Sequence, residues 1–133
     1  MDYRAISNLR TLQGKDSFRL WNERLINAFE QIAPGAESMF KQLIKAIDRK
    51  TDLVDLEDKW DSDVMELEVD DKQKDKLYWA KFGKNLNYVL QEKCEDAEAI
   101  SKIRAAGGEG IKAYVSLYKW YLGSSGQQLT LKA

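Results

Sequence analysis

The feature that most constrains the fold is a short segment near the C-terminus, residues 110–123, which is flanked by glycines and dense in aromatic side chains. Its apolar residues recur at the three- and four-residue spacing of an α-helix. They form one stripe of Ile111, Tyr114, Val115, Tyr118, Tyr121 and Leu122, with a second strip of Ala113, Leu117 and Trp120 beside it. Because few polar positions remain for water, we expect this helix to pack between other helices, either of its own chain or of a partner.

Helical spacing also marks the first half of the chain. The apolar positions between residues 18 and 32 are Phe18, Trp21, Leu25, Ala28, Phe29 and Ile32. Asp16 or Ser17 is suited to cap this helix, and Pro34-Gly35 ends it. A second helix follows over residues 36–49, and the short break between the two predicts a helical hairpin.

Further helices are expected after this hairpin. We predict one over residues 53–61, followed by a loop or a second helix. Asp71 is suited to cap a long helix that runs to about Lys93. Gly83 lowers the helix propensity of that segment by about 1 kcal/mol relative to alanine, and it leaves room for another helix to approach. Asp96 is expected to cap a short helix, which ends at a turn over residues 107–110.

Together these segments predict one all-α domain over residues 1–133, with about five or six helices around one core. Residues 1–15 are expected to form a short helix or an N-terminal arm that ends at Gly14. Residues 127–133 resemble the opening of a further helix, so we expect the chain to be part of a longer polypeptide.

Composition argues against most catalytic classes. The chain has no histidine and one cysteine, Cys94, so zinc sites and histidine-dependent triads are not expected. The carboxylates between residues 58 and 68 do not follow the calcium-loop template, and no glycine segment has the spacing of a phosphate-binding loop. We therefore predict a protein that is not an enzyme and needs no cofactor. We expect Cys94 to be a small buried side chain rather than a redox-sensing thiol.

No apolar run approaches the roughly 20 residues that span a bilayer, and the first residues do not resemble a signal peptide. We therefore expect an intracellular protein, in the cytoplasm or the nucleus.

Although the net charge is -1, two neighbouring segments carry charges of opposite sign. Ten acidic residues lie between Asp52 and Asp71, with Lys59 as the one basic residue among them. A lysine-rich segment follows directly, over residues 72–84. The simpler interpretation is two solvated faces, and the alternative is that the segments pair within the chain or between copies. The candidate interface residues are Asp61, Asp63, Lys72, Lys74, Lys76 and Trp79.

The four tryptophans divide between the core and possible contacts. We expect Trp21 and Trp120 in the core. Neighbouring residues of a helix face different ways, so either Tyr78 or Trp79 should be exposed or at a contact. Binding of single-stranded nucleic acid there, by stacking and lysine contacts, is a weaker alternative.

A set of residues spread along the chain forms a recognisable pattern of order and spacing. They are Leu12 to Gly14, then Phe18, Leu20, Trp21, Leu25 and Phe29, then Leu77, Tyr78 and Phe82, and last Gly108, Glu109, Gly110, Ala113, Tyr114, Leu117, Tyr118, Lys119, Trp120, Ser125 and Gly126. The order and spacing of these residues resemble the Gag-like polypeptide of copia-type LTR retrotransposons. The resemblance covers residues 9–133, and its C-terminal block is the most specific part.

The resemblance implies a helical capsid domain that associates with itself into shells around RNA and carries no catalytic residues. The chain lacks a zinc knuckle and the capsid homology block of retroviruses, so RNA contact is expected to be weak or to involve regions outside this chain. The leading hypothesis is a structural protein that acts by self-association. The alternative is a host-recruited helical subunit that binds a protein partner within a larger complex.

Overall fold

The computed structural model describes residues 4–123, which fold into α-helices without a β-strand. The helices of this range are α1 (Arg4–Ser7), α2 (Phe18–Ile32), α3 (Ala36–Asp48), α4 (Leu53–Met65), α5 (Asp71–Leu77), α6 (Trp79–Lys93), α7 (Ala97–Ala105) and α8 (Gly110–Leu122). The predicted all-α fold is confirmed. The count of five or six helices was too low, because the N-terminal segment contains α1 and the expected helix over residues 71–93 is divided. The further helix expected over residues 127–133 lies outside the described residues.

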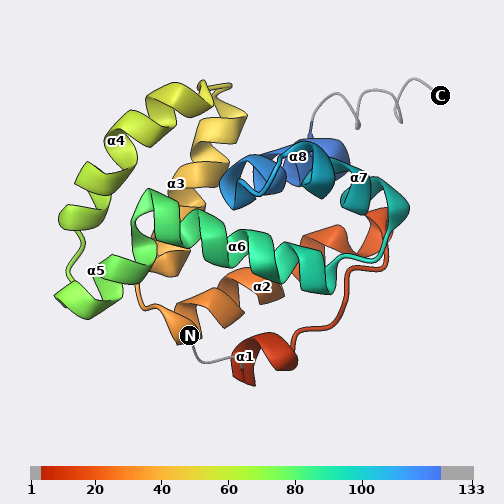
Figure 1. Ribbon diagram of the computed structural model, residues 1–133, viewed down its shortest axis with the longest axis horizontal. Coiled ribbons are helices and arrows are strands. Elements are labelled where there is room, and N and C mark those ends of the chain that lie inside the picture. The colour runs from red at the N-terminus through yellow and green to blue at the C-terminus, as the bar shows by residue number, and fades with distance from the viewer. Residues whose placement is uncertain (1–3, 124–133) are drawn as a thin grey trace.

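Helix α6 crosses the middle of the molecule, with α7 and α8 on one side and α2 on the other (Figure 1). Helix α8 contacts α6, α7 and α3. The prediction that the aromatic segment packs between other helices is therefore confirmed, with helices of its own chain as the neighbours. Helices α4 and α5 lie together at one end of α6 (Figure 1).

The N-terminal segment is part of the core. Ile6, Leu9 and Leu12 are buried, and the Leu12 amide donates a hydrogen bond of 2.7 Å to the Lys93 carbonyl at the end of α6. The Trp21 indole NH also reaches back to the Arg10 carbonyl, at 2.8 Å. These contacts tie residues 6–12 to both α2 and α6.

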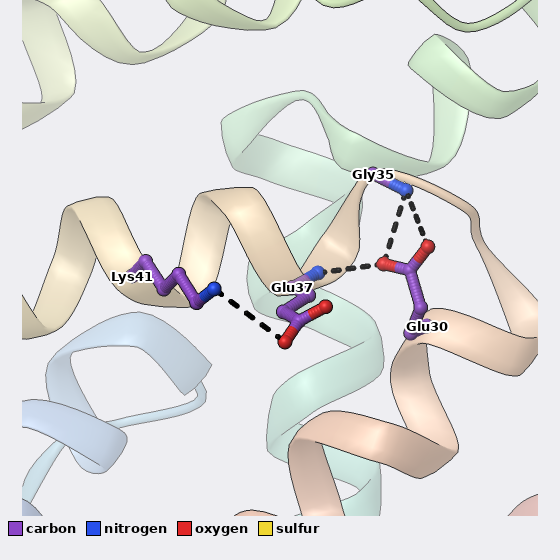
Figure 2. A network of polar contacts seen from close by, with 4 residues as sticks. All are labelled: Glu30, Gly35, Glu37 and Lys41. Atoms are coloured by element: carbon purple, nitrogen blue, oxygen red, sulfur yellow. Dashed lines mark hydrogen bonds and ion pairs between the residues drawn. The ribbon is translucent and has the colours of Figure 1, made fainter.

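The turn between α2 and α3 is closed by a carboxylate. Gly35 has a φ of 106°, a left-handed conformation that favours glycine. The Glu30 carboxylate accepts hydrogen bonds from the backbone amides of Gly35 and Glu37, at 2.9 to 3.2 Å (Figure 2). Glu37 in turn pairs with Lys41 at 3.6 Å. A side chain of α2 thus satisfies amides at the start of α3, which fixes the predicted hairpin.

The start of α2 differs from the expected cap. Ser17 precedes the helix but makes no side-chain capping bond. Its hydroxyl instead donates to the Gly14 carbonyl, at 3.1 Å, across a short 3₁₀ turn over Lys15–Ser17. Ser17 therefore occupies the expected N-cap position, but its side chain does not cap the helix, since the turn before the helix engages the serine hydroxyl.

The expected long helix is interrupted at Tyr78, which adopts an extended conformation with a ψ of 149°. The interruption leaves the Leu77 carbonyl and the Trp79 amide without helical partners. The Trp60 indole NH donates to the Leu77 carbonyl at 2.8 Å, and the Asp61 carboxylate accepts from the Trp79 amide, also at 2.8 Å. Two adjacent residues of α4 therefore stabilise the elbow between α5 and α6.

Other helix boundaries in this region also differ from expectation. Helix α4 continues without a break from Leu53 to Met65. Helix α5 is capped by Asp70, whose side chain accepts from the Gln73 amide at 3.0 Å, and not by Asp71. Asp96 caps α7 as expected, by accepting from the Ala99 amide at 3.4 Å.

Helices α6 and α8 cross at two glycines. A Cβ added to Gly110 would lie 2.0 Å from the Gly83 carbonyl oxygen and 2.4 Å from the Asn87 amide nitrogen. A Cβ added to Gly83 would meet nothing closer than Ile111, at 3.8 Å. The close approach expected at Gly83 is therefore present, but the missing side chain that permits it is that of Gly110.

Aromatic rings form much of the core. Phe40 lies 5.4 Å from Phe29, 5.1 Å from Phe82 and 5.3 Å from Tyr114, measured between ring centroids. The Tyr114 hydroxyl donates a buried hydrogen bond to the Asn22 side chain, which is the buried polar residue of α2. Rings from α2, α3, α6 and α8 thus meet at one point in the core.

The expected core residues divide into two groups. The buried ones are Phe18, Trp21, Leu25, Phe29, Phe82, Gly110, Tyr114 and Leu117. Tyr78 and Tyr118 are half-buried and pack against the core. Trp120 is 47% exposed, and the Lys102 ammonium of α7 lies 4.4 Å from its ring centroid. The expectation that Trp120 is in the core is therefore wrong, because its side of α8 faces solvent beside α7.

Candidate functional site

The six candidate interface residues gather where α4, α5 and α6 meet, and several of them stabilise the fold. The Trp79 ring lies 5.4 Å from the Trp60 ring in an edge-to-face arrangement. Trp79 is half-buried, as is Tyr78, so neither is fully exposed. Asp61 is the capping residue at the elbow. Some of the predicted interface residues, Trp79 and Asp61 among them, therefore contribute to packing within the chain.

Two of the candidate lysines bind helix ends. The Lys74 ammonium donates to the carbonyl of Met65, the last residue of α4, at 2.8 Å. The Lys76 ammonium donates to the carbonyl of Ile32, the last residue of α2, at 3.2 Å. A cation at a helix C-terminus satisfies an unpaired carbonyl and interacts favourably with the helix dipole. Both lysines therefore have a structural explanation.

The opposite charges of these segments do not neutralise one another within the described chain. Over residues 4–123, the charged side chains of α4, α5 and α6 form one ion pair, between Lys59 and Asp63 at 3.7 Å. Both of its partners belong to α4. The alternative of pairing between the acidic and basic segments of one chain is thus absent from residues 4–123, and most of these charges face solvent, as in the simpler interpretation.

A basic concavity lies at the elbow. We call it the lysine groove; it has a volume of about 590 Å³ and is lined by Lys72, Gln73, Asp75, Lys76, Lys81, Lys84 and Asn85. Lys72, Lys81 and Lys84 are exposed and form no ion pair within residues 4–123. Asp75 is the single carboxylate of the lining, so the groove presents a net positive surface.

A larger groove was not anticipated from the sequence. It has a volume of about 930 Å³ and lies between the C-terminal half of α3, the start of α4 and the C-terminal half of α8. Its apolar lining consists of Leu43, Ala46, Ile47, Leu53, Val54, Leu56, Val115, Tyr118 and Leu122. The only sequence signal for it was that the apolar face of α8 is wider than one neighbouring helix can cover.

The side chains of Cys94 and Tyr121 are buried in the fold near Asp96. Within residues 4–123, no cluster of three or more cysteine and carboxylate side chains could hold a metal ion. Burial, and to a smaller extent the charge of Asp96, raises the pKa of the Cys94 thiol to about 12. Burial also raises the pKa of Tyr121, whose hydroxyl donates to Asp96 at 2.6 Å. A thiol with so high a pKa is a poor nucleophile at neutral pH.

The described helices include none that is both long and apolar enough to cross a bilayer. Comparison of the chain with protein-family models, curated proteins and solved structures finds no match.

Proposed function

We propose that this chain is a non-enzymatic structural protein that acts by self-association, as a Gag-like capsid domain does. The observation that carries the proposal is the arrangement of charge around the elbow. The acidic surface of α4 and the lysine groove are close in the molecule and opposite in charge. No ion pair joins the two surfaces within residues 4–123. Surfaces of opposite charge steer association and fix the relative orientation of partners.

The all-helical fold also supports this proposal, because the resemblance to copia-type Gag polypeptides implies a helical capsid domain. The proposal places the protein inside the cell, in the cytoplasm or nucleus. Any contact with RNA is weak or belongs to regions outside this chain, since the chain carries no net positive charge.

The proposal is tested by light scattering coupled to size-exclusion chromatography over a concentration series. We expect the average mass to rise with protein concentration at low salt. We expect it to fall when the ionic strength increases from about 0.1 M to about 1 M, which shortens the screening length from about 10 Å to about 3 Å. A mass equal to that of the monomer at every concentration and salt would contradict self-association.

The second candidate function is that of a helical subunit that binds one protein partner in a larger complex. The observation that favours it is the apolar groove between α3, α4 and α8, since concave apolar surfaces commonly accept a partner segment. It predicts a monomer by light scattering and a stable one-to-one complex with a single partner. The substitution Val54→Glu, at the edge of the groove, should then weaken that complex.

A further inference from the structure

Helix α4 has an outward face that its own chain does not cover. Its inward residues Leu56, Trp60 and Val64 are buried in the core. The two most exposed large apolar side chains of residues 4–123 lie on its opposite side: Val54 is 69% exposed and Met65 is 62% exposed. Methionine is among the residues enriched at protein interfaces, and Val54 offers a second apolar contact on the same face.

The exposed residues of this face follow helical spacing. At 100° per residue, Val54, Asp55, Asp58 and Met65 fall within about 100° of arc, and about 16 Å of helix separates the two apolar ends. We call this set the α4 stripe. Asp55 and Asp58 are exposed and form no ion pair within residues 4–123. The stripe therefore presents free carboxylates between two apolar side chains.

The lysine groove is concave and opposite in charge to this stripe. The groove is concave because the chain bends at Tyr78, and the bend brings Lys72 and Lys76 of α5 to the same concavity as Lys81 and Lys84 of α6. Lysine side chains offer both a terminal charge and an apolar stem of four carbons. Ammonium groups suit Asp55 and Asp58, and the stems suit Val54 and Met65.

The two surfaces of one chain cannot meet each other. The inward side of α4 holds the elbow through Trp60, whose indole bonds the Leu77 carbonyl, so the side chains of the stripe lie on the side of α4 opposite to that contact. Turning the stripe toward its own groove would remove Trp60, Leu56 and Val64 from the core. Contact between stripe and groove therefore requires two molecules.

We propose that the α4 stripe of one molecule docks in the lysine groove of a second copy of the same chain. This inference rests on the proposed self-association and names the surfaces that produce it. The charge complementarity of the two surfaces argues for a second copy as the occupant, since each copy carries both halves of the contact. Every molecule then offers one stripe and one groove, which allows either a reciprocal dimer or head-to-tail growth.

Charge reversal with complementation tests the pairing. One variant carries Lys81→Glu and Lys84→Glu in the groove, and the other carries Asp55→Lys and Asp58→Lys in the stripe. Each variant alone opposes like charges, so its dissociation constant for self-association should rise at least about tenfold. An equimolar mixture of the two restores opposite charges at both contacts and should recover association. Sedimentation or light scattering measures both effects.

Matched controls separate this pairing from a general effect of net charge. Arg10→Glu with Arg24→Glu changes the net charge as the groove variant does, and Glu23→Lys with Glu92→Lys matches the stripe variant. All four positions are exposed and lie outside the stripe and the groove. Both controls should associate like the original chain. Circular dichroism and thermal melts establish that every variant is folded.

Asp55 lies in the first turn of α4, where a lysine opposes the helix dipole. The single substitution Asp58→Lys avoids that position and should weaken self-association in the same direction. Met65→Gln removes an apolar contact and should also weaken it, with no change in net charge.

The outcomes distinguish the two proposals. If the original chain is monomeric throughout, self-association itself is wrong. If the original chain associates while folded groove and stripe variants associate equally well, self-association stands and the docking of stripe in groove is wrong. Loss of association in each variant without recovery in the mixture would also overturn the proposed pairing.

Discussion

The crossing of α6 with α8 and the elbow between α5 and α6 are both close helix junctions, but they are stabilised in opposite ways. At the crossing, Gly110 lacks a side chain and the backbones approach directly. At the elbow, the helix is interrupted, and Trp60 and Asp61 of α4 bind the backbone groups left free. The first junction depends on residues within the two helices themselves. The second depends on side chains from a different helix, so local sequence does not reveal it.

The most damaging way to break the elbow is Trp60→Ala. Trp60 is fully buried and contacts both Trp79 and Phe82 through its ring. We expect unfolding free energy to fall by about 3–5 kcal/mol, which is typical for removing a large aromatic side chain from a core. Urea unfolding followed by circular dichroism measures the loss.

Trp60→Phe serves as the control, because it keeps a ring but cannot donate to the Leu77 carbonyl. It should retain more stability than Trp60→Ala and still lose at least about 1 kcal/mol, since that buried carbonyl is left unpaired. Full stability in either variant would contradict the structural role given to Trp60.

The corresponding way to break the crossing is Gly110→Ala. The added methyl would overlap the Gly83 carbonyl and force α8 away from α6, at a cost of about 1–3 kcal/mol. Gly83→Ala is the matched control. Its methyl meets only ordinary contacts and the new residue favours the helix, so stability should be unchanged or higher by up to about 1 kcal/mol. Equal thermal melts for the two variants would contradict this asymmetry.

A finer test of the elbow is Asp61→Ala, which removes the carboxylate that accepts from the Trp79 amide. A lost helix cap costs about 1 kcal/mol. Asp61→Asn keeps an acceptor oxygen and should lose less. Hydrogen exchange of the Trp79 amide reports the bond directly: exchange should be faster in the alanine variant, and an unchanged rate would argue against the cap.

The smallest effect is expected for Trp120→Ala, because this side chain is half exposed and lies beside Lys102. Stability should change by no more than about 0.5 kcal/mol. Trp21→Ala provides the contrast. Trp21 is buried and its indole bonds the Arg10 carbonyl, so its loss should cost about 3–5 kcal/mol. Similar losses in the two variants would mean that α8 buries Trp120 more deeply than the structure shows.

Only part of the candidate site could be predicted from the sequence. The sequence located the acidic and basic segments, because runs of like charge are visible in one dimension. It did not show that Lys74 and Lys76 bind the ends of α4 and α2, or that Asp61 caps α6. These roles depend on the distance between residues that are far apart along the chain. The apolar groove was missed for the same reason, since its walls come from three separate helices.

The sequence by itself determined the helical class, the hairpin of α2 and α3, and the burial of most of the apolar stripe of α8. Each follows from periodicity and from local turn and cap residues, which act over a few positions of the chain. Only the tertiary structure decided that the chain bends at Tyr78, that the N-terminal segment joins the core, and that Trp120 faces solvent. Backbone groups freed inside a helix need new hydrogen-bond partners, and at Tyr78 the distant side chains of Trp60 and Asp61 supply them, while burial depends on which helices are neighbours.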